Sequence, residues 1–388
     1  MLPLSGVKVI ELGQNLAGPY AGFILACMGA EVIKVERPGG GDDARGWGPP
    51  FVDDDASAIF NAVNANKASI TVDLKDAGQL AWLKSKIAAV DVVFQNLRPG
   101  VVDQLGLDGA TLTAANPKLV YCNLSAFGAV GPMKHLPGFE PMVQAISSLM
   151  YLSGEPDAPP YRVGTHILDH GTGMWAAMGI LAGLVRRAAT GQGGVVDASL
   201  FETGLGWVAT HFARHQAGGG LPQRHPTGSA GVVPFQAFET ANGPLVIAAA
   251  NDRLFAKLAT ALGRPAWIDD PRFKTNRDRA ANATPLLAGI GEVVATDTKG
   301  AWIDKLEAAG VPCAPVHNLE ETLAMPQVAA LNIVQQVEDL PITLMSIPLS
   351  FDGDRPPLRR RAPAIGADND RLGPDATPSS QERAGKSR

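Results

Sequence analysis

The chain has few cysteines, and none of them lies in a pattern that would form a disulfide framework. Its 388 residues include three cysteines, Cys27, Cys122 and Cys313. They are far apart in the sequence, no pair forms a C-x-x-C motif, and an odd count fits no complete set of disulfides. Stable disulfides are rare in the reducing cytosol. The cysteine content therefore predicts a cytoplasmic protein whose thiols are small core residues.

Long apolar runs, a targeting segment and an excess of positive charge are also lacking. No apolar run approaches the ~20 residues that a transmembrane helix needs. The N-terminal sequence MLPLSGVKVIEL has no basic segment followed by an apolar one, as a signal peptide would have. The formal net charge of −5 is unlike that of a nucleic-acid-binding domain. We therefore expect no membrane, no nucleic acid and no metal as partners.

Two nucleotide-binding motifs are missing. The first strand-like segment is followed by GQNLAGP, which is not the G-x-G-x-x-G fingerprint of dinucleotide-binding proteins. No phosphate-binding P-loop motif occurs either. These absences argue against a nicotinamide-dependent dehydrogenase and against chemistry that consumes ATP.

What the sequence does contain is a regular alternation of strands and helices. Hydrophobic residues make up 46% of the chain and charged residues 18%, which is typical of a globular protein with a large core. An apolar segment, a helix that ends at Gly29 and a second apolar segment form a βαβ unit, which favours a parallel sheet. Strands are predicted at residues 7–12, 31–35, 69–73, 91–94, 119–124 and 195–198. Helices are predicted at residues 78–88, 141–150, 172–188 and 200–216.

The length exceeds that of a single core, so two domains are expected. Residues 1–216 are predicted to form a large α/β domain, to which residues 325–373 return. The glycine-rich residues 217–234 are interpreted as a linker or mobile loop. Residues 235–324 are predicted to form a smaller α+β domain. Residues 374–388 are predicted to be a disordered tail.

Basic and polar side chains follow several of the predicted strands. Arg37, Lys75, Asn96 and Arg98 all lie in such positions. Ligands of open α/β sheets bind beyond the carboxyl ends of the strands. The pattern therefore predicts a phosphorylated ligand, although Arg37 could equally be a solvated loop arginine.

The longest apolar helix, which has Asp169 at its start, is the segment around which the chain is organised. Asp169 stands where an N-cap belongs, and Gly191 stands where a helix-ending glycine belongs. Asp169 is therefore either only an N-cap or a carboxylate with a free oxygen for chemistry. Small neighbours, Gly171 and Gly173, would let a ligand approach the backbone.

Several stretches together resemble the class III (family III) CoA-transferases, the group that includes formyl-CoA and carnitine CoA-transferases. They are LSGVKVIELGQNLAGPYAG, MGAEVIKVERPGGGD, NANKASITVDLK, QNLRPGVVDQLGL, GFEPMVQA and the ILDHGTG helix start. The resemblance covers all but the tail. It implies a large Rossmann-like domain with a mostly parallel sheet, a smaller α+β domain, and an interlocked homodimer of ring-like chains.

The resemblance also implies roles for individual residues. Asp169 matches the catalytic aspartate, which carries acyl and CoA groups covalently, and Phe139 and Glu140 match an aromatic–acid pair beside it. Glu140 is therefore a second catalytic candidate. The expected CoA-binding residues are Asn15, Leu16, Ala17, Arg37, Val72, Lys75, Asn96, Leu97, Arg98 and Phe139. Gly228 and Gly231, in the glycine-rich loop, are candidate oxyanion donors or lid residues.

The implied reaction moves CoA from an acyl-CoA to a free carboxylic acid, with CoA as part of the substrate and no tightly bound cofactor. A carboxylate with an ordinary pKa of ~3.9 needs no partner base, so His166 and His170 are interpreted as structural. The sequence departs from formyl-CoA transferase at Leu16, where that enzyme has glutamine. Gln104 stands where some members have an arginine, which puts one nucleotide contact in doubt.

Two other functions remain open on the sequence. An α-methylacyl-CoA racemase shares this fold, but that branch places a histidine before the acid, where this chain has Phe139. Racemisation requires two groups that exchange a proton at the α-carbon. The other alternative is a non-catalytic CoA-binding protein, which would bind CoA without transferring it.

Overall fold

The computed structural model describes residues 1–53, 56–229 and 231–374, and it divides into two compact units. The first unit comprises Met1–Leu149, Arg162–Ala213 and the described residues from Gln327 onward, and the second comprises Met150–Tyr161 and Arg214–Pro326. Residues 375–388 of the predicted tail lie outside the described residues. Within the described ranges, no helix is both long and apolar enough to cross a membrane.

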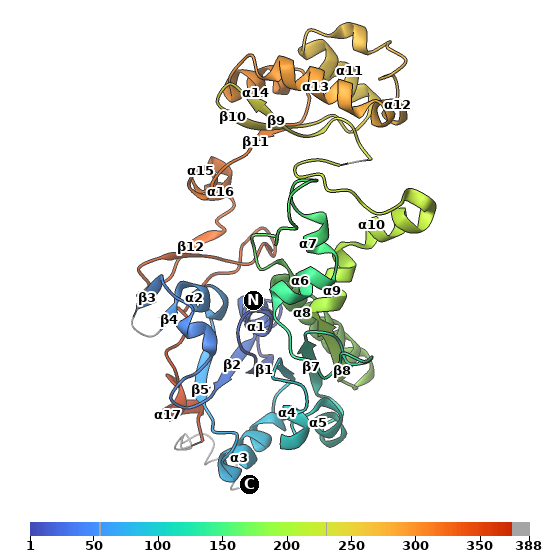
Figure 1. The fold of residues 1–388 in the computed structure, drawn as a ribbon. Helices are drawn as coiled ribbons and strands as arrows, with labels where there is room; N and C mark the ends of the chain where they lie inside the picture. The colour runs from blue at the N-terminus through green and yellow to red at the C-terminus, as the bar shows by residue number, and fades with distance from the viewer. Residues whose placement is uncertain (54–55, 230, 375–388) are drawn as a thin grey trace. The chain divides into compact units, whose positions relative to one another are not determined.

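A six-stranded sheet forms the centre of the first unit, and all of its neighbouring strands are parallel (Figure 1). The strands are β1 (Lys8–Leu12), β2 (Glu31–Glu36), β5 (Ala68–Thr71), β6 (Val92–Gln95), β7 (Val120–Ser125) and β8 (Gly194–Ser199). Their order across the sheet is β5-β2-β1-β6-β7-β8. The α/β class with a parallel sheet is therefore confirmed.

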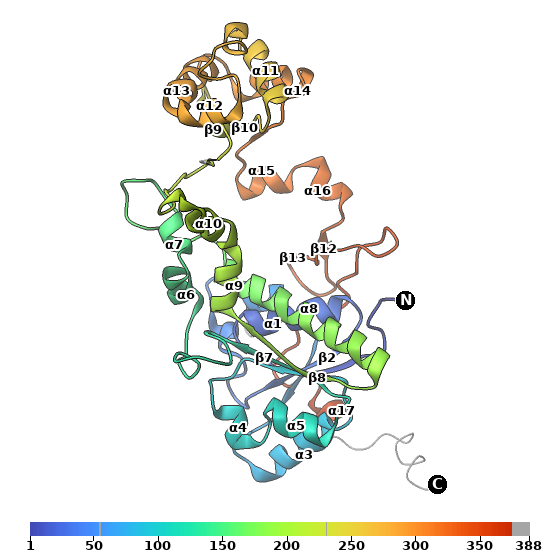
Figure 2. The ribbon, with the colours of Figure 1, turned by 90° about the vertical axis from the view of Figure 1, so that its right-hand side faces the viewer.

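Helices cover both faces of this sheet, which explains why its strands are apolar on both sides. On one face, α1 (Ala17–Cys27) and α8 (Ile167–Thr190) pack on a core that includes Val9 and Val120. On the other face, α3 (Ala77–Ile87), α4 (Val101–Leu105) and α5 (Gly109–Ala115) pack on a core that includes Ile10 (Figure 2). Alternate residues of the central strands β1, β6 and β7 thus enter opposite cores.

The order of the strands defines a point where ligands bind. Numbered along the chain, the six strands lie in the order 3-2-1-4-5-6, so the direction of succession reverses between β1 and β6. Crevices at such a reversal, outside the carboxyl ends of the strands, are the usual ligand sites of open parallel sheets. The loop from β1 to α1 and the loop from β6 to α4 border this crevice.

Three of the predicted helices have boundaries that differ from those in the structure. The long helix α8 begins at Ile167 with His166 as its N-cap, so Asp169 is its third residue and the N-cap prediction is wrong. The predicted helix 141–150 is divided by the left-handed Ser148 (φ 70°) into α6 (Glu140–Ile146) and α7 (Leu149–Leu152). The predicted helix 200–216 is divided into α9 (Leu200–Trp207), α10 (Ala209–Arg214) and a π-helical turn, His215–Gly219.

The remaining elements of the first unit are short. They are the 3-10 turn Asp43–Gly46, β3 (Phe51–Asp53), β4 (Ala56–Ser57), α2 (Ala58–Asn64), α16 (Pro326–Ala330, whose first residue belongs to the second unit), β12 (Val334–Gln336), β13 (Thr343–Met345) and α17 (Asn369–Leu372). The last of these lies beside β5, because Asn369 donates from its side-chain amide to Thr71 Oγ1 at 2.8 Å. The C-terminal segment thus returns to the edge of the central sheet.

The second unit has its own antiparallel sheet and its own core. Its strands are β9 (Phe235–Thr240), β10 (Gly243–Ala248) and β11 (Cys313–Pro315), in the order β11-β10-β9. Its helices are α11 (Asp252–Ala261), α12 (Asn276–Ala281), α13 (Ala283–Val294), α14 (Lys299–Ala308) and α15 (Leu319–Leu323), with a 3-10 turn at Pro265–Trp267. Residues such as Leu245, Leu258 and Ile290 are fully buried in this core.

Candidate active site

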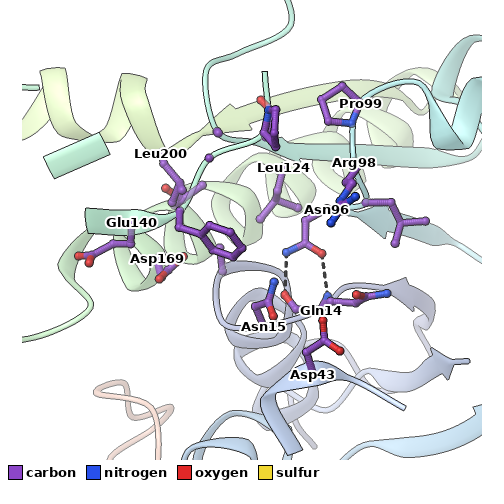
Figure 3. A pocket seen from close by; sticks show the side chains of 18 of the residues that line it. Gln14, Asn15, Asp43, Asn96, Arg98, Pro99, Leu124, Glu140, Asp169 and Leu200 are labelled. Atoms are coloured by element: carbon purple, nitrogen blue, oxygen red, sulfur yellow. Dashed lines mark hydrogen bonds between the residues drawn. The ribbon is translucent and has the colours of Figure 1, made fainter. Parts of the chain in front are cut away.

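A cavity of about 600 Å³ opens at the carboxyl ends of the central strands, at the reversal between β1 and β6. Its wall is built by loops from several elements of the first unit (Figure 3). The lining residues come from several segments of the chain. They include Gln14, Asn15 and Ala17 after β1, Asn96, Leu97 and Arg98 after β6, Ser125 and Ala126 at the end of β7, residues 136–140, and Asp169 and Thr172 of α8. Residues that are far apart in the sequence therefore meet at one site.

Asp169 lies in the first turn of α8 and is partly buried at the cavity wall. Burial raises the pKa of this carboxyl group to about 7, the negative charge of Glu140 adds to the rise, and Arg162 opposes it. The ordinary pKa expected for Asp169 from the sequence is therefore wrong, because the position of the side chain adds the effect of burial. Near neutral pH the carboxyl group therefore exists in both its protonated and its ionised form.

Glu140 is held in the core of the first unit by two neighbours. Its side chain is only 3% exposed and accepts a hydrogen bond from Gln144, one turn later on α6. Arg162 Nε pairs with Glu140 Oε2 at 3.1 Å, and Arg162 Nη2 lies 3.3 Å from His166 Nδ1. These contacts join α6 to the segment that enters α8, so they fix Asp169 relative to Glu140. Arg162 could not be identified from the sequence, because an isolated arginine in a loop has no distinguishing pattern.

Phe139 lines the cavity, whereas the two histidines near Asp169 do not. Phe139 is 62% exposed, lines the cavity and is the N-cap of α6. The ring of His170 meets Tyr20 edge-on, with 4.5 Å between their centroids. Burial lowers the pKa of His170, and the nearby His166 contributes to this shift. Neither histidine lines the cavity, which is consistent with their interpretation as structural residues.

The loop from β1 to α1 has an unusual backbone that other elements hold in place. Asn15 has a left-handed conformation (φ 64°), and Leu16, the N-cap of α1, is buried. The side-chain amide of Asn96 accepts from Gln14 N at 2.7 Å and donates to Gln14 O at 2.8 Å. Asn96 thus ties together the two loops at the reversal point as well as lining the cavity.

The predicted nucleotide-binding residues are divided between two cavities that share three lining residues. Arg37, Leu97 and Arg98 line the main cavity, where Arg37 pairs with Asp43. A second cavity of about 160 Å³ is lined by Val72, Lys75, Arg37 and Leu97 among others, and Gln14 lines both. Val72 is almost fully buried, so it presents little surface to a ligand. Leu16 lines neither cavity.

The candidate lid residues Gly228 and Gly231 belong to the second unit. A β-carbon at Gly228 would lie 2.9 Å from Gln236 Cβ, so this glycine is tightly packed. Gly231 O accepts a hydrogen bond from Asn276 Nδ2 at 2.9 Å. Their part in the chemistry remains a prediction. Among the described residues, no three His, Cys, Asp or Glu side chains converge as a metal site.

We expect Asp169→Asn to stabilise the fold at alkaline pH. The folding of the chain raises the pKa of this carboxyl group. The folded state therefore loses stability as the pH increases from the pKa in the unfolded chain to the pKa of about 7 in the folded chain, and the loss remains at higher pH. Asparagine does not ionise, so the melting temperature of the variant should exceed that of the wild type at pH 8. The gain should vanish below pH ~4. Asp103→Asn, which removes an exposed carboxylate, controls for a change in surface charge, and a gain independent of pH would contradict the prediction.

Comparison with known proteins identifies relatives over nearly the full length of the chain. The sequence pattern described as CoA-transferase family III matches residues 4–369. The succinate–glutarate CoA-transferase of Agrobacterium fabrum is 34% identical, over 97% of this chain and 98% of its own. The acetyl-CoA:oxalate CoA-transferase of Acetobacter aceti is 37% identical, over 94% and 93%, and the succinyl-CoA:glutarate CoA-transferase of Mus musculus is 36% identical, over 90% and 80%.

Solved structures show the same fold. A CAIB/BAIF family protein from Brucella suis superposes with a TM-score of 0.84 at 34% identity, covering 99% of both chains. Rv3272 from Mycobacterium tuberculosis gives a TM-score of 0.85 at 29% identity, covering 96% of this chain and 99% of that one. With the parallel sheet and the cavity at its reversal point, these matches show that the chain is a CoA-transferase that belongs to CoA-transferase family III.

Proposed function

We propose that this enzyme transfers CoA from an acyl-CoA thioester to a free dicarboxylic acid, with Asp169 as the covalent nucleophile. The observation that carries the proposal is a partly buried carboxylate on the wall of the cavity at the reversal point of the sheet. The named substrates of the relatives, among them succinate, glutarate and oxalate, support the class of acid.

The proposed reaction proceeds in two halves that mirror each other. The ionised Asp169 attacks the carbonyl carbon of the donor thioester, which breaks the C–S bond and yields an acyl-aspartyl anhydride and CoA thiolate. The thiolate then attacks the aspartyl carbonyl carbon, which releases the donor acid and leaves an aspartyl-CoA thioester. The acceptor carboxylate attacks this thioester to form a new anhydride and thiolate. Attack of the thiolate on the acceptor carbonyl carbon gives the product acyl-CoA and regenerates Asp169.

The environment of Asp169 suits this role in two respects. Partial burial removes water that would otherwise stabilise the ionised form, so the carboxylate is more basic than an exposed aspartate. Each tetrahedral intermediate needs hydrogen-bond donors for its oxyanion. The first N–H groups of α1, which begins at Ala17 beside the cavity, have no partner within the helix. We propose these groups as donors, with Gly228 and Gly231 as further candidates.

The CoA moiety is proposed to lie along the ends of β1, β2 and β6. Arg37 and Arg98 line the main cavity, and Lys75 lines the smaller one that adjoins it through shared residues. Cationic side chains of this kind bind phosphate groups. The pantetheine chain would then extend past Asn15 and Ala17 towards Asp169.

The racemase alternative has less support. Phe139 cannot exchange a proton, and no histidine occurs among the described residues that line the cavity. A non-catalytic CoA-binding role would leave the partly buried carboxyl group of Asp169, on the cavity wall, without a function. Exchange of the α-proton of an acyl-CoA with deuterated water, in the absence of CoA transfer, would favour the racemase.

The proposal is tested by a screen of acyl-CoA donors against carboxylic acid acceptors, with products read by mass spectrometry. We expect the highest rates for pairs such as succinyl-CoA with a C2 to C5 dicarboxylate. Matched monocarboxylates of the same length serve as controls. Equal rates for the monocarboxylates would contradict the proposed class of acid, and no transfer with any pair would contradict the proposed function.

We also propose a homodimer, for which α8 and α9 supply an apolar face. Met174, Trp175 and Met178 on α8, and Leu205 and Trp207 on α9, are each more than 40% exposed. Exposed large apolar residues gathered on adjacent helices are typical of a protein interface. The resemblance to the class III CoA-transferases implies an interlocked homodimer, which is the arrangement we propose.

The double variant Trp175→Glu/Met178→Glu is expected to be monomeric, because two carboxylates would have to be desolvated in the interface. Light scattering after size exclusion measures the mass directly. Val130→Glu, an exposed apolar residue in a loop, is the control and should remain dimeric. A wild-type monomer, or a double variant that stays dimeric, would refute the assignment of this face.

A further inference from the structure

Beneath the β1–α1 loop lies a cluster of charged side chains that the proposed reaction does not use. Glu11 and Lys34, on β1 and β2, and Lys67, which precedes β5, are all fully buried, and Asp42, after β2, is 1% exposed. Lys34 Nζ lies 3.2 Å from Glu11 Oε1 and 2.7 Å from Asp42 Oδ2. Lys67 Nζ lies 2.8 Å from Glu11 Oε2. The four side chains form a chain of alternating charge with no net charge.

Three members of this cluster make hydrogen bonds to the backbone of the β1–α1 loop or of the first turn of α1. Lys34 Nζ donates to Gly13 O at 2.7 Å, and Lys67 Nζ donates to Pro19 O at 2.7 Å. Asp42 Oδ1 accepts from Asn15 N at 2.9 Å. The start of the loop, its middle and the first turn of α1 are thus each held by a charged side chain from a different segment of the chain.

The protein backbone makes room for these charges. A β-carbon at Gly22, on α1, would lie 2.0 Å from Glu11 Oε2 and 3.0 Å from Lys67 Nζ. No side chain larger than hydrogen fits there unless the cluster moves. Helix α1 therefore lies directly against the ion pairs, and its first turn is positioned by them as well as by the loop.

A second group of side chains holds Asp42 itself. Glu36 Oε2 accepts from Asp42 N at 2.9 Å, and Arg45 donates to both oxygens of Glu36. Ser69 Oγ donates to Glu36 Oε1 at 2.6 Å. The segment after β2 that carries Asp42 is therefore fixed from the side of β5 as well.

Burial of so many charges needs an explanation other than stability. Desolvation of two ions costs about as much as their attraction returns, and apolar residues of similar volume would often be as stable or more so. Hydrogen bonds from charged groups are, however, short and strongly directional. In this protein the charged side chains hold the backbone of residues 13–19, which includes the left-handed Asn15, through hydrogen bonds.

The loop and helix α1 pack against α8, the helix that carries Asp169. A β-carbon at Gly173, one turn after Asp169, would lie 2.7 Å from Ala17 O and 3.2 Å from Ala21 N. The backbones of α1 and α8 are therefore in close contact beside the cavity. A displacement of residues 15–17 would change the distance between this loop and the carboxylate.

We propose that Lys34 and Lys67 are positioning residues, which hold the β1–α1 loop in the conformation that receives the acyl-CoA. They act through Gly13, Asn15 and Pro19 and do not touch the substrate. The inference rests on the proposed function only for the identity of the ligand.

The test uses two double variants of the full chain. Each removes one positive and one negative charge, so the net charge of the protein does not change. Glu11→Gln/Lys67→Met removes the bond to Pro19 and keeps the Lys34–Asp42 pair. Lys34→Met/Asp42→Asn removes the bond to Gly13 and keeps the Glu11–Lys67 pair. Because each variant retains one pair, failure of one to fold leaves the other to test the inference. The control, Leu83→Ala, removes a fully buried side chain from the core on the opposite face of the sheet.

We expect each double variant to raise KM for acyl-CoA and the Kd of CoA by about tenfold, the effect of losing one charge-assisted hydrogen bond. KM for the free acid should stay within twofold, and the backbone amides of residues 14–17 should exchange hydrogen faster. The control should lower the melting temperature without changing KM for acyl-CoA. Unchanged KM and exchange in the folded double variants, or equal changes in the control, would overturn the inference.

These outcomes are distinct from a failure of the proposed function. If the wild type transferred no CoA to any acid, the proposed reaction would be wrong, but CoA binding and hydrogen exchange would still report on the loop. If the wild type transferred CoA and the double variants kept their Kd for CoA, only the role of the lysines would be wrong.

Discussion

Replacement of Asp169 by alanine is expected to lower the rate of CoA transfer by a factor of about 10⁴ or more, as is typical for loss of a covalent nucleophile. The side chain supplies the oxygen that accepts the acyl group, and none of its neighbours can replace it. Glu140, the other carboxylate nearby, is buried and engaged by Gln144 and Arg162. Initial rates of acyl-CoA consumption and formation, measured with a matched donor and acceptor, give the size of the loss.

A chemical trap distinguishes covalent catalysis from a merely structural effect of this substitution. Wild-type enzyme incubated with acyl-CoA and then with hydroxylamine or borohydride should carry its modification on the peptide that contains Asp169. The Asp103→Ala variant, which loses an exposed carboxylate, should be labelled and active to the same extent as the wild type. Full activity of Asp169→Ala, or labelling at another residue only, would refute the proposed mechanism.

Removal of Arg162 is expected to have the second largest effect, because its charge acts on both carboxylates. Loss of the partner leaves the buried carboxylate of Glu140 without a cation. This should cost about 2 kcal/mol of folding free energy, less than for a fully buried pair because the Arg162 side chain is 33% exposed. Arg162 also lowers the pKa of Asp169, whereas Glu140 raises it. Arg162→Met should therefore raise that pKa above its wild-type value of about 7.

The dependence of kcat/KM on pH measures this shift. Because the nucleophile is the ionised form, wild-type activity should rise with pH through about 7, and about one tenth of the sites are ionised one pH unit below the pKa. Arg162→Met should move this rise to higher pH, and Glu140→Gln should move it to lower pH. The double variant, which contains neither charge, should lie between them and is expected to fold better than Arg162→Met. A rise at the same pH in all four proteins would show that Asp169 is not the titrating group.

The sequence predicts the central sheet well because its signals are local. Each strand is a short apolar run that ends at polar residues, and all six predicted strands of the sheet are present within two residues of their predicted bounds. The helices were less well predicted. A left-handed Ser148 divides one predicted helix, and no local sequence pattern distinguishes Asp169 at the third position of α8 from an N-cap. The helix α13 (Ala283–Val294) was missed, since its core contacts arise only in the folded second unit.

The candidate site, like the fold, was predicted from the sequence only in part. Arg37, Lys75, Asn96 and Arg98 were expected from the rule that ligands bind beyond the ends of parallel strands. Arg37, Asn96 and Arg98 line the main cavity, whereas Lys75 lines only the smaller one. The raised pKa of Asp169 could not be predicted, because it depends on burial and on Glu140, which is 29 positions earlier in the chain. The pairing of Arg162 with Glu140 and the buried lysines were missed for the same reason, namely that they depend on contacts across elements.

The amide of Asn96 has a mechanical consequence for the entrance of the cavity. Its oxygen and its nitrogen both bond to Gln14, so a shift of one rim of the crevice is transmitted to the other. With CoA placed as proposed, a nucleotide that displaced Arg98 on one rim would also displace residues 14–17 on the other. A displacement caused by the phosphate groups of the substrate would thus also move the loop beside its thioester group, and both places belong to the first unit.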